Sequence, residues 1–410
     1  MTDLDTVRQM DAADPLAAFR QRFLLPEGQI YLDGNSLGAL PRDTPARVAD
    51  TVAREWGEGL VGSWNSADWI GAPQRIGAKI ARVIGAAPQE VLVADSTSVN
   101  LFKLLVAAIG ARPGRHVILT EPGNFPTDLY IAQGVAALLP RVDVRTVPRA
   151  DIVAAIDPDT AVVLLTHVHY KSGALFDMAA ITRAAHDHGA LALWDLSHSV
   201  GAVELDLTAA NADLAIGCGY KYLNGGPGAP AFLYVAARHQ ATLRSPLTGW
   251  MGHAAPFDFG DDYAAGAGVN RFLCGTPPIL GMAALEVGVD LWLEADRAAL
   301  FQKSRALCSL FIELVEQRCA GLGLTLASPA AADARGSHVS FAHADGYPVM
   351  QALIARGVIG DFRAPDVLRF GFTPLYIGYE DVWRAVEILR DVLDSGSWDT
   401  PAFRARAAVT

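Results

Sequence analysis

Two residues of this chain have side chains that could act together on one small-molecule cofactor. Asp195 ends the apolar run LALWD, and Lys221 follows the apolar run LAIG within the glycine-rich stretch GCGYKYLNGGPG. A lysine amine can form a Schiff base with an aldehyde, and a carboxylate can hold a ring nitrogen protonated. Taken singly, Asp195 could be a structural ion pair or a cap, and Lys221 a solvated loop lysine. As a pair at the ends of strand-like runs, they predict a pyridoxal-phosphate enzyme.

Two further stretches carry residue types that suit such a cofactor. VLVADSTSVNLFKLL places Thr97 and Ser98 between a strand-like run and a helical pattern. Hydroxyls and free backbone N–H groups at a helix N-terminus can hold a phosphate, although an ordinary helix cap is the alternative. EPGNFPTDLY places Phe125 after a short strand, where its ring could stack on a pyridine face or pack in the core.

Short apolar runs alternate with helical patterns through the first two thirds of the chain. Strands that are buried on both faces of a parallel sheet read as continuous apolar runs, so this pattern predicts an α/β fold with a mainly parallel sheet. Ligands of such sheets bind at the carboxyl ends of the strands, where Asp195 and Lys221 are expected to lie. The predicted helices are Leu101–Ile109 and Met178–His188, and the predicted strands are Val117–Thr120, Ala161–Thr166, Ala190–Asp195, Asp213–Gly217 and Ala231–Val235.

The pattern changes near Met282 to long helical stretches, followed by the segments SHVSF and VLRFGF, which are typical of antiparallel strands. We therefore expect a smaller α+β domain after the large one. The expected division is an N-terminal segment at 1–45 that packs with the small domain, a large cofactor-binding domain at 46–290 and a small C-terminal domain at 291–410.

Composition narrows the class of protein. The chain has 410 residues, 51% of them hydrophobic, and a net charge of −11. This balance indicates a globular protein and argues against nucleic acid or an anionic membrane surface as partner. The N-terminal stretch MTDLDTVRQMDAAD does not resemble a signal peptide, and no long apolar run predicts a membrane span. The four cysteines lack zinc-site or disulfide-framework spacing, so we expect a cytoplasmic protein that binds small molecules and no metal.

Seven segments, in order over nearly the whole chain, resemble the kynureninase family. They are YLDGNSLG at 31–38, GSWNSADW at 62–69, NFPTD at 124–128, WDLSHSVGA at 194–202, GCGYKYLNGGPG at 217–228, GWMGH at 249–253 and LRFGFTPLY at 368–376. The resemblance implies the aminotransferase fold type I and hydrolytic cleavage of the Cβ–Cγ bond of L-kynurenine, giving anthranilate and L-alanine, in tryptophan catabolism. It also implies a homodimer with shared active sites.

The resemblance assigns roles to individual positions. Lys221 would be the Schiff-base lysine and the base for the α-proton, Asp195 the partner of the pyridinium nitrogen, and Tyr220 an acid/base group that also binds the phosphate. The other implied cofactor contacts are Thr97, Ser98, Phe125, Pro126, Thr127, Asp128, Thr166 and His198, with Trp250 and Thr276 reaching the site from the partner subunit.

Substrate contacts are implied at Arg369, for the α-carboxylate, and at Trp64 and Ser36 in the pocket. Arg369 could instead pair with a surface acid, and Trp64 could be a core residue. Trp64 and Thr276 match the bacterial type of the family, which favours kynurenine over its 3-hydroxy form. His169 departs from the family pattern, in which we expect an amide residue.

Three alternatives stay open at this stage. A cysteine desulfurase or an aminotransferase shares the Asp and Lys pair. The desulfurase needs a catalytic cysteine, for which Cys274 in RFLCGTPP is the nearest candidate, and usually a histidine where Phe125 lies. A non-catalytic protein that binds pyridoxal phosphate is the alternative of another class.

Overall fold

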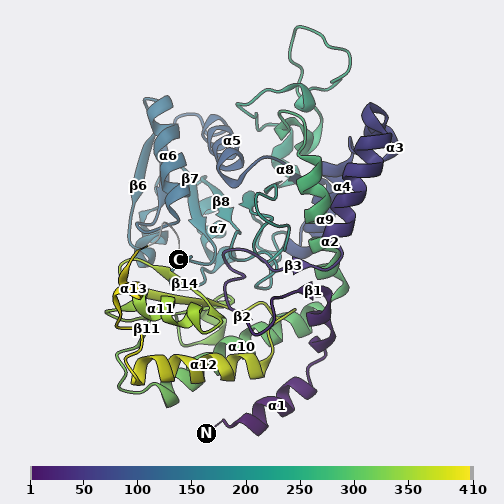
Figure 1. Cartoon of the computed structure of the whole chain (residues 1–410). Helices are drawn as coiled ribbons and strands as arrows, with labels where there is room; N and C mark the ends of the chain where they lie inside the picture. Colours follow the sequence, from purple (N-terminus) through teal and green to yellow (C-terminus); the bar gives the residue numbers. More distant parts are fainter. Residues whose placement is uncertain (1, 407–410) are drawn as a thin grey trace.

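The computed structural model describes residues 2–406 and contains a large central sheet above a smaller one (Figure 1). The order of the seven strands in the central sheet is β4-β10-β9-β8-β7-β5-β6. β10 alone runs opposite to the other six strands, so the predicted mainly parallel sheet is confirmed. The strands are β4 (Val91–Val93), β5 (Val117–Thr120), β6 (Asp143–Thr146), β7 (Thr160–Thr166), β8 (Leu191–Asp195), β9 (Leu214–Gly217) and β10 (Phe232–Val235).

Helices cover both faces of this sheet, which explains its continuous apolar strands. In β8, Leu191 and Leu193 face one core, and Ala192 and Trp194 face the other. The first core contains α5 (Thr97–Gly110) and α6 (Pro126–Leu138), and the second contains α4 (Ala72–Ile84), α7 (Met178–Asp187) and α9 (Ile279–Glu294). Because successive side chains of a strand point to opposite faces, every position must be apolar.

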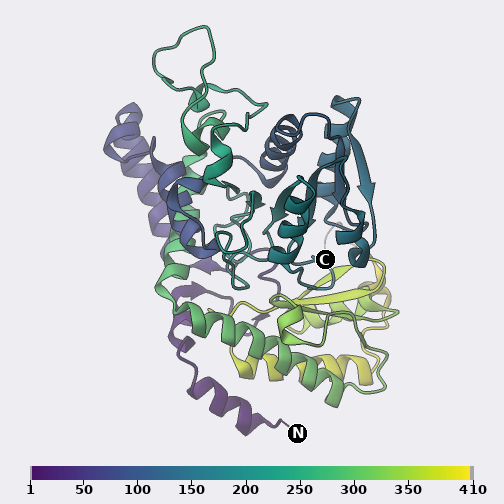
Figure 2. The same cartoon turned by 180° about the vertical axis from the view of Figure 1, so that it is seen from behind.

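The smaller sheet has the order β11-β12-β15-β14 and is antiparallel, as SHVSF and VLRFGF predict. Its outer face packs on α10, where Phe311 lies 6.0 Å from Phe341 and 4.9 Å from Phe370 between ring centroids. The elements are β11 (Thr325–Leu326), β12 (His338–Ala342), β14 (Asp361–Arg363), β15 (Val367–Gly371), α10 (Arg297–Arg318), α11 (Gly346–Ala355) and α12 (Tyr379–Asp394), seen from behind in Figure 2.

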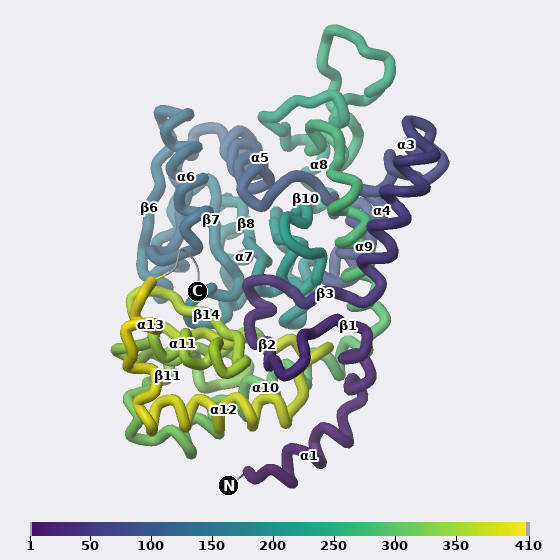
Figure 3. The backbone as a smooth tube through the Cα atoms, viewed as in Figure 1, coloured from purple at the N-terminus to yellow at the C-terminus, as the bar shows by residue number. Residues whose placement is uncertain are grey.

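The N-terminal segment joins the two parts of the molecule, as the purple trace in Figure 3 shows. Helix α1 (Leu4–Ala12) packs on α12, β2 (Ile30–Tyr31) pairs with β13 (Val358–Ile359), and α2 (Thr44–Asp50) packs on α9. The remaining elements are β1 (Phe23–Leu24), β3 (Leu40–Pro41), a π-helical segment Thr51–Glu58, α3 (Ser63–Ser66), α8 (Ala237–Gln240) and α13 (Pro401–Arg404). Within residues 2–406, no helix has the length and apolar character needed to cross a bilayer.

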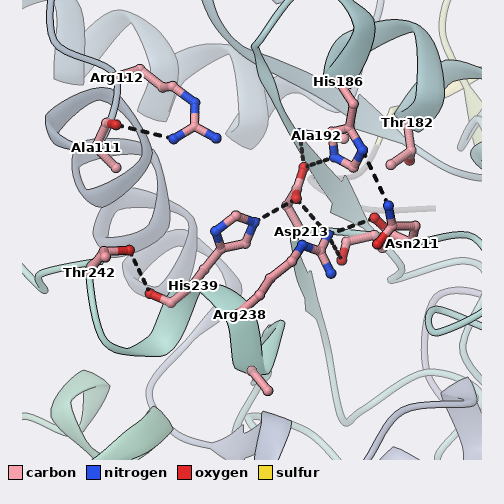
Figure 4. Close-up of polar contacts among 12 residues, drawn as sticks. Ala111, Arg112, Thr182, His186, Ala192, Asn211, Asp213, Arg238, His239 and Thr242 are labelled. Atoms are coloured by element: carbon pink, nitrogen blue, oxygen red, sulfur yellow. Dashed lines mark hydrogen bonds and ion pairs between the residues drawn. The ribbon is translucent and has the colours of Figure 1, made fainter.

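A buried carboxylate organises the amino ends of the central strands. Asp213, directly before β9, accepts hydrogen bonds from His186 (2.8 Å), Arg238 (2.7 Å), His239 (2.7 Å) and the backbone N–H of Ala192 (2.8 Å) (Figure 4). These hydrogen bonds outweigh burial and hold the pKa of Asp213 below its ordinary value. The cluster ties α7 and α8 to β8 and β9 at the sheet edge opposite the carboxyl ends.

Candidate active site

The carboxyl ends of β7 and β8 bring three predicted site residues together. Thr166 ends β7, Asp195 ends the neighbouring β8, and Asp128 lies in the first turn of α6. The Thr166 hydroxyl lies 3.0 Å from a carboxylate oxygen of Asp128, and the backbone N–H of Ser197 donates to Asp195 at 2.7 Å. All three predicted side chains are buried.

Asp128 and Asp195 form a hydrogen-bonded pair of carboxyl groups. Burial raises both pKa values, and the charge of Asp195 raises that of Asp128 further. Two buried carboxyl groups in contact repel each other when both are ionised, and the nearby Lys221 charge offsets the raised pKa values only in part. Asp128, whose pKa is raised well above its usual range, therefore keeps the proton, and Asp195 is the anion of the pair.

Lys221 lies beside this pair in a buried position, with only 7% of its surface exposed. This excludes the alternative of a solvated loop lysine. Its Nζ lies 2.9 Å from His198 Nε2, and burial together with the Lys221 charge lowers the pKa of His198 well below its usual range. His198 is therefore a neutral imidazole that accepts from the amine through Nε2. Its Nδ1 has no hydrogen-bond partner in the part of the chain that the structure describes.

Aromatic rings border the lysine. The Lys221 Nζ lies 5.6 Å from the ring centroid of Phe125 and 5.8 Å from that of Tyr220. Phe125 packs edge-to-face on Tyr170 at 5.3 Å and is only partly buried, so it is not a core residue. His169 donates from Nε2 to the carbonyl of Gly123 at 2.9 Å, so this departure from the family pattern holds the loop before Phe125.

Arg369 comes to the same region from β15 and is buried. Its Nε donates to Asp361 at 2.8 Å, its Nη2 donates to Asp361 and to Ser36 Oγ, the latter at 2.8 Å, and its Nη1 donates to the carbonyl of Tyr170 at 2.6 Å. Arg363 also donates to Asp361 at 2.6 Å. The alternative of a surface ion pair is wrong, because Asp361 is as buried as Arg369. The predicted residues Arg369 and Ser36 are in direct contact.

The predicted phosphate-binding stretch forms the start of α5, which begins at Thr97 and not at Leu101 as predicted. Ser96 is the N-cap, and its hydroxyl accepts from the N–H of Val99 at 3.4 Å. Thr97 and Ser98 occupy the first two helical positions and are partly exposed. Since Ser96 already caps the helix, these two hydroxyls are available to an anion.

The donor set fits pyridoxal phosphate. A protonated pyridine nitrogen would be a second cation beside the buried Asp128 and Asp195 pair, and Lys221, whose charge acts on both acids, supplies an amine for an aldehyde. The unpartnered His198 Nδ1 offers a further contact. Pro126 and Thr127, predicted with Phe125, lie in the first turn of α6.

Three predicted residues are not brought to Lys221 by this single chain. Trp250 and Thr276 are exposed and line two separate surface pockets. Trp64 lies on α3, where it packs edge-to-face on Trp69 at 6.1 Å and is half-buried. None of the three has a contact with the lysine or the acid pair within residues 2–406.

Sequence reasoning missed Asp361, Asn124 and His338. Asp361 stands in the apolar segment VIGDF, where a carboxylate inside a strand requires a cationic partner. The side-chain oxygen of Asn124, in the predicted NFPTD segment, accepts from the backbone N–H of Phe125 at 2.7 Å and from the Thr166 hydroxyl. His338 opens β12 as a fully buried polar residue, which an imidazole within SHVSF could have signalled.

Comparisons with known proteins agree with this geometry. A model of the kynureninase C-terminal domain matches residues 300–389, and a model of the DegT/DnrJ/EryC1/StrS aminotransferase family matches residues 73–214. Among solved structures, an apo cysteine desulfurase from Thermococcus onnurineus NA1 has a TM-score of 0.79 at 19% identity, covering 92% of this chain and 98% of its own. A C-DES mutant with glycine covalently linked to its PLP cofactor has a TM-score of 0.78 at 17% identity, covering 91% of this chain and 99% of its own. These two similarities show the fold type I architecture.

Similarity at the sequence level is much stronger. The kynureninase of Burkholderia mallei (strain SAVP1) is 53% identical over 407 residues, covering 98% of both chains. The kynureninase of Pseudomonas fluorescens is 52% identical over 416 residues and covers all of both chains. On this identity over the full length, the chain belongs to the kynureninase family.

Proposed function

We propose that this chain is a pyridoxal-phosphate-dependent hydrolase that cleaves the side-chain Cβ–Cγ bond of L-kynurenine to give anthranilate and L-alanine. The observation that carries the proposal is the buried amine of Lys221 beside the buried acid pair of Asp128 and Asp195. Full-length identity to kynureninases supports the choice of substrate.

The two acids, Lys221 and His198 each have a separate role in the proposed reaction. Bound pyridoxal phosphate supplies an electron sink for the bonds around the substrate's Cα. Asp195 stays anionic and would hold the ring nitrogen protonated, while Asp128 keeps its proton and donates a hydrogen bond to Asp195. The Lys221 amine takes and returns the proton at Cα, and the neutral His198 ring accepts a hydrogen bond from that amine.

Tyr220 is the acid for the later proton transfers. Burial, followed by the charges of Cys218 and Asp195, raises the pKa of Tyr220, so the phenol keeps its proton at neutral pH. The Tyr220 ring is half-buried, and its centroid lies 5.8 Å from the Lys221 Nζ. From there the protonated phenol can donate to an oxygen or carbon that gains charge when the Cβ–Cγ bond breaks.

A desulfurase activity is disfavoured by the state of the thiols. Burial raises the pKa of Cys274, and its Sγ donates to the carbonyl of Leu247 at 3.5 Å. Desulfurase chemistry needs a thiolate, which requires a lowered pKa. Burial also raises the pKa of Cys218, Cys308 and Cys319. The site also has Phe125 where the desulfurase alternative requires a histidine.

The site is completed by a second copy of the chain in this proposal. Trp250 packs edge-to-face on Phe257 at 5.7 Å between ring centroids, and the teal-green loop that protrudes at the top of Figure 1 belongs to this part of the chain, which exposes large apolar side chains. Phe259 is 76% exposed and Phe257 56% exposed. Monomeric proteins rarely leave such groups in water. A homodimer covers them and brings Trp250 and Thr276 to the partner's cofactor.

In this proposal, the active site is built from all three ranges of the chain, the N-terminal segment, the large domain and the small domain. The segments 1–45 and 291–410 contribute Ser36, His338 and Arg369, and the range 46–290 contributes the lysine and the acid pair. A cytoplasmic location is the accompanying proposal, supported by four cysteines that are all free, three of them buried.

Incubation of the purified protein with pyridoxal phosphate and L-kynurenine tests the proposed function, with anthranilate fluorescence as the measurement. We expect stoichiometric anthranilate and L-alanine, and slower turnover of 3-hydroxykynurenine. Sulfide release from L-cysteine without anthranilate formation would contradict the proposal and favour a desulfurase.

A further inference from the structure

His338 is a buried histidine without a hydrogen-bond partner. Its side chain has no exposed surface, and within residues 2–406 neither ring nitrogen is hydrogen-bonded. Burial, followed by the charge of Arg369, lowers the pKa of His338 to about 3, so the ring is neutral at physiological pH. A neutral imidazole has one N–H donor and one acceptor, and leaving both unpaired in a protein interior costs free energy. Such a residue calls for a polar partner that arrives from outside the chain.

The strand register directs this ring into the active site. Ser340 pairs directly with Arg369 across β12 and β15, and His338, two residues earlier, shares their face of the sheet. The opposite face carries Val339, Phe341 and Phe370 toward α10. His338 therefore lies on the polar face that looks toward the large sheet.

His338 lies near both the reactive amine and the guanidinium. Its ring centroid is 5.4 Å from that of His198, whose Nε2 is 2.9 Å from the Lys221 Nζ. After burial, the charge of Arg369 is the largest cause of the lowered pKa of His338, so the guanidinium also lies close to this ring. An α-amino acid that reacts at Lys221 and points its carboxylate at Arg369 therefore comes close to this imidazole.

Arg369 alone cannot bind a carboxylate by its usual two parallel hydrogen bonds. Of its five N–H groups, two donate to Asp361, one to Ser36 and one to the carbonyl of Tyr170, which leaves one on Nη1. A carboxylate accepts at two oxygens, so a second donor is needed for it to be held in one orientation. The ring N–H of His338 and the Nε of Arg363 are buried donors without a partner that the described residues offer on this face, and of the two the His338 ring lies beside His198.

We propose that His338 is a substrate-binding residue whose ring N–H donates to the α-carboxylate of the amino acid substrate, beside the single free N–H of Arg369. This inference rests on the proposed function, since it takes an α-amino acid as the substrate. Asp361 then serves to fix the orientation of the guanidinium, and His338 supplies the second hydrogen bond that fixes the carboxylate.

The test compares ligands with and without a carboxylate on the holoenzyme. L-Alanine and ethylamine differ only by this group, and their affinities for wild type, His338→Leu and His338→Gln are measured by calorimetry. We expect His338→Leu to weaken L-alanine binding about 10- to 100-fold, the range for a hydrogen bond to a charged group. Ethylamine binding should not change, and His338→Gln, which keeps an N–H donor, should recover most of the L-alanine affinity.

Stability separates this role from a structural one. Because His338→Leu removes two unpaired polar atoms from the interior, its unfolding temperature should equal or exceed that of the wild type. His343→Leu, five residues further along the same segment and packed on Trp398, is the control and should bind L-alanine normally. If His338→Leu does not fold, His338→Phe, which keeps a flat ring but has no N–H, replaces it with the same expected loss.

The outcomes distinguish the two proposals. A wild type that cleaves L-kynurenine while its leucine variant binds L-alanine normally overturns the role of His338 alone. Equal losses for L-alanine and ethylamine overturn it as well, because they indicate a damaged site. A wild type that neither cleaves L-kynurenine nor binds L-alanine overturns both the proposed function and this inference.

Discussion

Asp128 and Asp195 are hydrogen-bonded to each other at the buried carboxyl end of the central sheet, although they come from a helix and a strand far apart in the sequence. Thr166 contacts Asp128, and the backbone N–H of Ser197 stabilises Asp195. The pair holds one proton and one negative charge, which is the arrangement that a cationic ring requires on its nitrogen side.

The two acids should respond differently to amide substitution. Asp195→Asn removes the anion, so we expect a large loss of kcat and weaker retention of pyridoxal phosphate. Asp128→Asn keeps a hydrogen-bond donor toward Asp195, so kcat and the retention of pyridoxal phosphate should both fall much less than in Asp195→Asn. Steady-state kinetics and cofactor dissociation constants check this order, and an equal effect of the two substitutions would contradict the assignment of the proton to Asp128.

Lys221→Ala should abolish turnover while leaving the fold intact. Within residues 2–406, the only side-chain hydrogen bond of this amine is to His198, so little folding energy depends on it. The variant should lose the visible absorbance of the lysine-bound cofactor and retain its circular dichroism spectrum. Lys79→Ala, which removes a lysine paired with Glu286 and Asp290 instead, serves as control and should keep the absorbance. Full turnover by Lys221→Ala would rule out the role of this lysine.

Arg369→Lys should raise KM for L-kynurenine by about 10-fold or more with a smaller change in kcat, because an ammonium cannot reproduce the planar guanidinium contacts. Arg356→Lys, on an exposed ion pair with Asp391, is the control. Arg369→Ala should in addition lower stability, since it leaves the buried Asp361 with only the half-exposed Arg363 as counter-ion. An unchanged KM in the lysine variant would make Arg369 a purely structural residue.

The proposed sharing of active sites between two subunits predicts complementation between two inactive variants. Lys221→Ala supplies a normal Trp250, and Trp250→Ala supplies a normal Lys221, so a mixed dimer contains one intact site. Refolding the two variants together at equal amounts should give about one quarter of wild-type activity, because half of the dimers are mixed and half of their sites are intact. Activity no higher than the average of the separate parents would show that Trp250 acts within its own chain.

Asp213→Asn should destabilise the protein without changing KM, because the cluster lies at the opposite edge of the sheet. The carboxylate accepts four hydrogen bonds, and we expect a loss of about 3 kcal/mol in the free energy of unfolding at pH 7, reduced from the buried-pair range because Arg238 is partly exposed. Asp187→Asn, at an exposed position of α7, should have little effect.

The stability difference at Asp213 should depend on pH in a defined direction. Its pKa is lower in the folded protein than in the unfolded chain, so its contribution is complete above the unfolded value of about 3.9 and declines as the pH falls below it. The difference between wild type and Asp213→Asn should therefore be constant from pH 7 to pH 5 and narrow below about pH 4. A difference that grows on acidification would contradict this reading.

The sequence by itself determined much of the local structure and predicted the reactive pair. Because strands buried on both faces must be apolar throughout, the runs ending in Thr166 and Asp195 gave β7 and β8 to within one residue at each end. Antiparallel strands at SHVSF and VLRFGF followed from the same local rules. The spacing of Asp195 and Lys221 at strand ends was sufficient to predict the cofactor class.

Only the tertiary structure decided which side chains meet. Three contacts of the site join elements that are distant along the chain. They are Asp128 with Asp195, Asp361 with Arg369, and His338 with His198. Local propensity depends on neighbours in sequence, whereas a pKa or a hydrogen bond depends on the distance between groups after packing. For this reason three features could be identified only from the positions of both sheets. They are the proton on Asp128, the hydrogen bonds that occupy the Arg369 guanidinium, and the His338 ring without a hydrogen-bond partner among the described residues.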